Sequence, residues 1–234
     1  NKAGKERRFL AAAFGGGEME VQRLYHRELS EFDVVPGTPL SYWVPEDLRL
    51  LYDSEIVLDA DNANVEADSL GSAKVGLQTG DDSRFTHRFW EDFDSSDWVP
   101  FAKGGADSWL LPRIKRTLLW EEDGTEIKHY GGSYPRNESD YFTESLTYTV
   151  AKRSGRRFGY LYEESIFGHK GSVLIPKRAI WNVLSYTNSH LFTYLMLTQT
   201  SERMWEVGFV SKVPWREELE DINELADLSR EAVG

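Results

Sequence analysis

The spacing of apolar residues divides the chain into three regions. Residues 5–29 carry apolar positions on a helical period, and Gly15, Gly16 and Gly17 interrupt them as a flexible joint. From residue 72, short runs rich in Val, Thr, Phe, Tyr and Trp are separated by Gly, Pro, Asp and Ser, which predicts an antiparallel β unit. Near residue 178 the helical period returns.

Proline, glycine and small polar residues mark the segment between the first helix and the β unit. Pro36-Gly37 and Pro39 predict a turn, and Pro45 opens a short helix. Residues 59–71 are acidic, small and polar, so we expect a loop there.

The C-terminal third is predicted to be mainly helical. Residues 178–199 form two helices, with Asn188-Ser189 ending the first and capping the second. Residues 205–215 read as one further strand, stopped by Pro214. Residues 216–234 are amphipathic, with acidic residues in the first turn where the helix dipole favours them.

These patterns predict an α+β fold with a β-rich, mostly antiparallel central unit flanked by N-terminal and C-terminal helices. Residues 1–71 are interpreted as a helical entry or connector segment, 72–215 as the central domain and 216–234 as a C-terminal amphipathic helix.

Composition places the chain among folded globular proteins. Hydrophobic residues make up 40% and aromatic residues 13% of the 234 positions. The absence of cysteine excludes disulfides and thiolate metal sites, which fits a cytoplasmic protein. No apolar run is long enough to cross a membrane. The first ten residues lack an initiator methionine and a signal-peptide core, so we expect the chain to be part of a longer protein.

The net charge of −12 is unevenly distributed. Residues 101–178 hold 13 Lys and Arg against 10 Asp and Glu, whereas the remainder holds 14 against 29. A mildly basic middle therefore lies between acidic flanks, and local potential rather than total charge attracts a polyanion. Two other interpretations stay open: the acidic flanks solubilise the surface, as in halophilic proteins, or they bind protein partners.

Motifs for cofactor binding and hydrolysis are missing. The sequence contains no G-x-G-x-x-G, no P-loop, no G-x-S-x-G and no Pro-Pro-Tyr run. The five histidines are scattered without ligand spacing. We therefore expect no cofactor and no metal in this chain.

One enzymatic alternative rests on Asp107, Glu126 and Lys128. An Asp followed by Glu-x-Lys is the arrangement with which many nucleases bind Mg²⁺ and activate water. The same stretch also reads as a turn between strands at Asp123-Gly124.

The basic positions of the middle region are the stronger candidates for binding. "KVGLQTGDDSRF" predicts a strand over 74–79, a turn at Gly80-Asp81 and a second strand from Arg84, with Arg84 and Arg88 on one face. "KRSGRR" predicts a hairpin tip with four cations, which suits phosphate binding. The candidate set is Arg84, Arg88, Lys103, Arg113, Lys115, Arg116, Lys152, Arg153, Arg156, Arg157 and Lys170.

Aromatic residues offer a further means of contact with nucleic acid. Trp98, Trp109, Tyr134 and Tyr141 are able to stack on bases, although single aromatics in β units more often lie in the core.

The order of motifs resembles a known family. "FDVVPGTPLSYWV", "VGLQTGDDSRF", "WVPFAKGG", "LLWEEDGTEIKHY", "YFTESLTYTV", "SIFGHKG", "LSYTNSHLFTYLM" and "VGFVSKVPW" resemble the C-terminal half of PglX-type proteins, from about residue 32 to 215. These are adenine-specific DNA methyltransferases of BREX phage-defence systems, related to fused restriction-methyltransferases.

The resemblance implies that residues 72–215 are a target-recognition domain. In such proteins a Rossmann-like catalytic domain with S-adenosylmethionine and an Asn-Pro-Pro-Tyr motif precedes it, and the target adenine is flipped into that upstream domain. The expected partner is duplex DNA, with other defence-system subunits as a further possibility. Arginines are expected to read guanine and lysines to neutralise phosphates.

Overall fold

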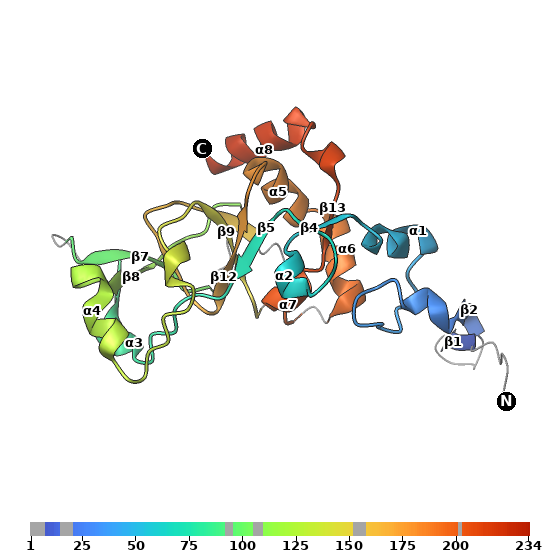
Figure 1. Ribbon diagram of the computed structural model, residues 1–234, viewed down its shortest axis with the longest axis horizontal. Coiled ribbons are helices and arrows are strands. Elements are labelled where there is room, and N and C mark those ends of the chain that lie inside the picture. Colours follow the sequence, from blue (N-terminus) through green and yellow to red (C-terminus); the bar gives the residue numbers. More distant parts are fainter. Residues whose placement is uncertain (1–7, 15–20, 92–95, 105–109, 152–157, 201–202) are drawn as a thin grey trace.

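The computed structural model describes residues 8–14, 21–91, 96–104, 110–151, 158–200 and 203–234. Helices and mostly antiparallel sheets confirm the predicted α+β class (Figure 1). The strands are β1 (Arg8–Phe14), β2 (Val21–Glu28), β3 (Ile56–Val57), β4 (Asp68–Ser69), β5 (Gly71–Lys74), β6 (Thr86–Arg88), β7 (Trp98–Ala102), β8 (Arg116–Leu119), β9 (Ser145–Thr149), β10 (Phe158–Leu161), β11 (Ile166–Phe167), β12 (Gly171–Pro176) and β13 (Pro214–Trp215).

The helices are mostly short. They are α1 (Glu46–Arg49), α2 (Ala60–Ala63), α3 (Asp82–Phe85), α4 (Glu121–His129), α5 (Ile180–Thr187), α6 (His190–Gln199), α7 (Val207–Val210) and α8 (Asn223–Val233), with 3-10 turns η1 (Leu29–Phe32), η2 (Leu50–Tyr52), η3 (Glu138–Asp140) and η4 (Glu217–Leu219). Within the described ranges, no helix has the length and hydrophobicity needed to span a bilayer.

Two four-stranded sheets form the centre of the protein. One has the order β10-β9-β12-β5 and is antiparallel throughout. The other has the order β11-β7-β8-β6, in which β11 runs parallel to β7 and the other pairs are antiparallel. The β1–β2 hairpin and the three-stranded sheet β13-β3-β4 complete the set among the described residues.

Strand β12 lies between two hydrophobic cores. Val173 belongs to the core around β7, β8 and α4, whereas the adjacent Leu174 belongs to the core that α5 and α6 cover. Successive side chains of a strand point to opposite faces, so one strand serves both cores. Every residue of β9 and β10 is buried, although β9 alternates Leu146 and Tyr148 with serine and threonine.

The larger core joins distant parts of the chain. The Tyr52 hydroxyl donates to the Leu195 carbonyl at 2.5 Å, and Leu219 packs against the same cluster. Ser189 caps α6 by accepting a hydrogen bond from the Phe192 amide at 3.0 Å, as the sequence predicts. Helix α8 packs on α5 (Figure 1). Residues from all three predicted segments therefore contribute to this core.

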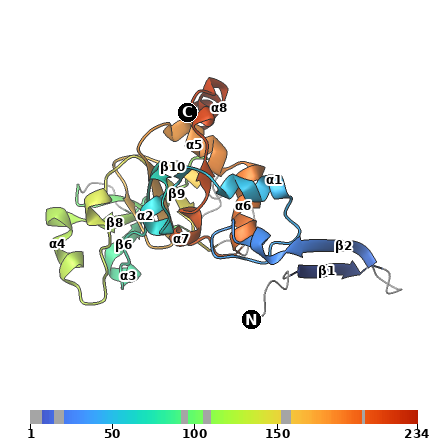
Figure 2. The ribbon, with the colours of Figure 1, turned by 45° about the vertical axis from the view of Figure 1, so that its right-hand side comes forward.

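The N-terminal region differs from its predicted helix. β1 and β2 form an antiparallel hairpin, which projects from the end of the molecule near α1 (Figure 2). The three glycines between the strands, which lie outside the described residues, each cost a helix about 1 kcal/mol relative to alanine. In the hairpin, the backbone N–H and C=O groups of the residues on either side of the glycines form hydrogen bonds between the strands, so no continuous helix is needed.

Two further predictions were wrong in detail. Residues 59–71 are not simply a loop, because Asp59 caps α2 and β4 and β5 follow. Residues 205–215 are not one strand: they contain α7, and Pro214 begins β13 instead of ending a strand. Proline is tolerated there because β13 is the edge strand of its sheet.

Candidate nucleic-acid interface

A basic pocket lies between the two central sheets. Its volume is about 220 Å³, and five of the predicted cations line it together with residues of β7 and β9. These five side chains come from three separate stretches of sequence, and no acidic residue lines the pocket among the described residues. They are Arg88, Lys103, Arg113, Lys115 and Arg116.

Strand pairing places two of these arginines opposite each other. Arg88 ends β6 and Arg116 begins β8, and the antiparallel register makes them direct partners. Like charges at directly opposite positions destabilise a sheet. Arg113 and Lys115 precede β8 and are exposed, and among the described residues neither has an acidic partner. The pocket therefore contains two exposed cations, Arg113 and Lys115, that no acidic side chain of the described residues pairs.

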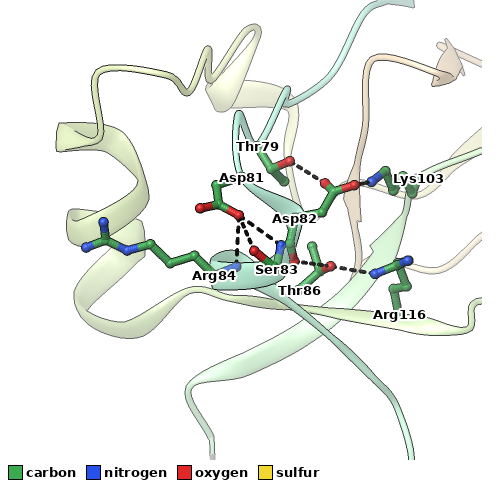
Figure 3. Close-up of polar contacts among 8 residues, drawn as sticks. All are labelled: Thr79, Asp81, Asp82, Ser83, Arg84, Thr86, Lys103 and Arg116. Carbon is green, nitrogen blue, oxygen red and sulfur yellow. Dashed lines mark hydrogen bonds and ion pairs between the residues drawn. The ribbon is translucent and has the colours of Figure 1, made fainter.

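Helix α3 orients two cations of the pocket, Lys103 and Arg116 (Figure 3). Asp82 accepts a hydrogen bond from the Thr79 hydroxyl at 2.5 Å and forms an ion pair with Lys103. The Asp82 carbonyl accepts from Thr86 Oγ1 at 2.8 Å, and the same hydroxyl accepts from Arg116 Nη1 at 2.7 Å. One short helix thus fixes Lys103 directly and Arg116 through Thr86.

The electrostatics of neighbouring groups reflect this concentration of charge. Burial, together with the positive charges of Arg116 and Lys170, lowers the pKa of Lys103 below its ordinary value. Burial and the charges of Lys170, Lys103 and Arg136 likewise lower the pKa of His169. A bound anion would offset both effects.

Gly104 brings the Lys103 and Lys170 segments together. Its φ of +80° lies in the left-handed region, and an added Cβ would lie 2.2 Å from the Lys170 carbonyl oxygen. Only glycine fits this close approach without strain. Lys170 itself is exposed and does not line the pocket, although its charge acts on Lys103.

The residues of β9 that line the pocket are uncharged. Thr147 and Thr149 of β9 line it, and the Thr147 hydroxyl lies 3.3 Å from the Gly171 carbonyl oxygen. The Lys and Arg side chains provide donors for phosphate oxygens, whereas the Thr147 hydroxyl already donates to a backbone carbonyl. Among the described residues, no group of three His, Asp or Glu side chains is placed to hold a metal ion.

Arg84 lies away from this pocket. It belongs to α3, not to a strand shared with Arg88, so the prediction that both leave one strand face was wrong. Asp81 begins α3 by accepting from the Ser83 and Arg84 amides at 3.0 and 3.2 Å. The Ser83 hydroxyl, followed by the Arg84 amide, lowers the pKa of Asp81. The Asp-Asp-Ser run is a helix-capping signal that the turn interpretation missed.

The residues of the nuclease alternative are engaged elsewhere. Glu126 pairs with Arg84, and Lys128 pairs with Asp123 and Glu138. Asp107 lies outside the described residues. Residues 121–129 form α4, with left-handed backbone over 122–124, instead of the predicted hairpin turn.

The two strands predicted to flank "KRSGRR" pair antiparallel as β9 and β10, with Phe158 opposite Tyr148. Thr147, Tyr148 and Thr149 of β9 line the pocket. The four cations of the tip lie outside the described residues; they are Lys152, Arg153, Arg156 and Arg157.

The predicted stacking aromatics are dispersed. Tyr141 is buried in the core that includes Ile127 of α4. Trp98 stacks on His87, with 4.0 Å between the ring centroids. Tyr134 is exposed and does not line the pocket, and Trp109 lies outside the described residues.

The sequence matches no protein-family model, and no curated protein matches it.

Proposed function

We propose that this chain binds duplex DNA through the basic pocket and the adjoining β9–β10 hairpin. The observation that carries the proposal is the convergence of five cations, without an acid among the described lining residues, on one pocket of a chain whose net charge is −12. The fold therefore brings basic side chains together at one place although the chain as a whole is acidic. A surface of this kind suits the phosphate backbone of a nucleic acid.

The cations of the pocket are proposed to have different roles in binding. Arg113 and Lys115 are exposed and free of acidic partners among the described residues, so they are available to phosphates. Arg116 presents a planar guanidinium that its Thr86 contact orients. Arg88 and Arg116 belong to strands β6 and β8, which hold them more rigidly than loop residues are held.

The parent protein is proposed to be an N6-adenine DNA methyltransferase of a phage-defence or restriction-modification system. This part of the proposal rests on the resemblance of residues 32–215 to PglX-type proteins. Residues 72–215 would then serve target recognition, while the methyl donor binds a separate catalytic domain. The gene is expected to encode an S-adenosylmethionine loop and Asn-Pro-Pro-Tyr upstream of Asn1. A complete reading frame without them would contradict this part.

DNA binding is tested by the salt dependence of affinity. Fluorescence anisotropy with a labelled duplex measures the dissociation constant at several NaCl concentrations. For three to five neutralised phosphates, affinity is expected to fall roughly 40- to 500-fold between about 50 and 200 mM salt. Saturable binding with no salt dependence, or no binding at low salt, would contradict the proposal.

A further inference from the structure

An apolar groove adjoins the basic pocket. Its volume is about 420 Å³, and its lining includes Phe89, Leu111 and Tyr162. These side chains are 56%, 41% and 47% exposed, respectively. Large apolar side chains gathered in an exposed hollow indicate a binding surface, whereas single exposed ones need no explanation.

The groove and the pocket share one wall. Pro112, Ile114 and Arg116 line both hollows. A ligand with an anionic group in the pocket can therefore place an attached apolar or aromatic group in the groove. A nucleotide has this construction, because its phosphate is charged and its base is planar with apolar faces.

We infer that the groove receives the base of an unpaired nucleotide whose phosphate lies in the basic pocket. The inference rests on the proposed DNA binding and adds a preference for displaced bases. A base inside a duplex has both faces covered by its neighbours, so only an unpaired base offers a face to Phe89 or Tyr162. Glu164 also lines the groove, and a carboxylate accepts hydrogen bonds from a base amino group.

The adjoining positive charge favours a nucleotide over an apolar protein segment as the occupant. Arg116 keeps its guanidinium at the shared wall through its hydrogen bond to Thr86. An entirely apolar partner would cover this charge without pairing it, which is unfavourable. A nucleotide places its planar base in the groove and its negatively charged phosphate in the pocket at the same time.

The test compares two labelled duplexes that differ by one bulged nucleotide. Anisotropy gives the dissociation constant of each for the wild-type chain, Phe89→Ala and Tyr162→Ala. Trp43→Ala is the matched control, since Trp43 is also an exposed aromatic but does not line the groove. The wild type and Trp43→Ala are expected to bind the bulged duplex about tenfold more tightly than the paired one. Each groove variant should lose most of this preference and keep its affinity for the paired duplex.

The outcomes separate this inference from the proposed function. Equal binding of both duplexes by the wild type overturns the groove inference and leaves duplex binding intact. A bulge preference that survives in both groove variants also overturns it, because the preference then arises elsewhere. Binding of neither duplex at low salt overturns the proposed function itself.

Discussion

Arg88 and Arg116 face each other directly across the β6–β8 pair, at the rim of the pocket that both line. Two like charges in this position oppose strand pairing unless a counter-charge lies between them. The protein keeps them although acidic residues are abundant in its sequence. The pair is therefore one of the features on which the proposed binding of an anionic ligand rests.

Arg88→Thr is expected to separate stability from binding. Threonine suits a strand and removes the repulsion with Arg116, so the free energy of unfolding should rise by about 0.5 kcal/mol. Duplex affinity should fall, because one cation of the pocket is lost. Urea denaturation and anisotropy measure the two quantities. A destabilised variant with unchanged DNA affinity would show that Arg88 has a structural role.

Arg84→Ala should have little effect on DNA binding. Arg84 Nε and Nη2 both donate to Glu126 Oε1, at 2.9 and 2.6 Å, and the side chain is outside the pocket lining. The pair is exposed, so its removal should change the free energy of unfolding by no more than about 1 kcal/mol. A loss of affinity as large as that of Lys115→Ala would place Arg84 at the DNA interface.

The pH dependence of binding should depend on Lys103. An ordinary lysine has a pKa of about 10.4. The pKa of Lys103 in the unliganded protein is lower, so its side chain loses a proton at a lower pH. A bound phosphate favours the charged form, so affinity should fall as pH rises through the lowered pKa. Lys103→Arg stays charged and should flatten this profile. Identical profiles for both proteins would contradict the assignment.

The same shift affects stability without ligand. Between the lowered pKa and the ordinary lysine value, the unfolded chain binds more protons at Lys103 than the folded protein. The contribution of this group to the free energy of unfolding therefore rises with pH in that window. Urea denaturation of wild type and Lys103→Arg across the window isolates this contribution.

Gly104→Ala tests the contact between the Lys103 and Lys170 segments. The new Cβ would meet the Lys170 carbonyl at a φ of +80°, so we expect a loss of about 2 kcal/mol or more in the free energy of unfolding. Gly208→Ala is the control, because Gly208 lies in α7 and no described atom outside that helix comes within 4 Å of the Cβ that alanine would add. That variant should be neutral or more stable by up to about 1 kcal/mol. Similar effects at both glycines would refute the close approach.

Local signals predicted the buried strands and the last helices well. β10 and β12 are rich in apolar residues, β9 alternates apolar residues with Ser and Thr, and Ser189 caps α6 at the predicted boundary. These features depend on residues close in sequence. The fold class follows from them.

The errors lie where distant partners decide the structure. β1 is stabilised by β2 across a glycine run, and Pro214 joins a strand only because Val57 pairs with it. The one-turn helix α3 depends on Asp81, a local signal that the alternation of apolar residues concealed. The pattern of apolar residues within a short segment cannot predict which distant strand that segment pairs with.

The candidate site was predicted in part. Basic composition identified the cations, but their convergence depends on the β6–β8 register and on the Gly104 contact, which leave no pattern in sequence. Phe89 directly follows β6 and Tyr162 directly follows β10, and no sequence pattern distinguishes them from core aromatics. Their exposure could be recognised only in the folded structure.

Removal of two exposed pocket cations tests the central claim most directly. The double variant Arg113→Ala/Lys115→Ala is compared with Lys177→Ala/Arg203→Ala, which removes the same charge from positions outside the pocket lining. Anisotropy with one duplex across a salt series should show a roughly 10- to 100-fold loss at low salt for the pocket variant only, with a salt slope shallower by about 1.8. Equal losses in the two double variants would show that binding follows net charge and not this pocket.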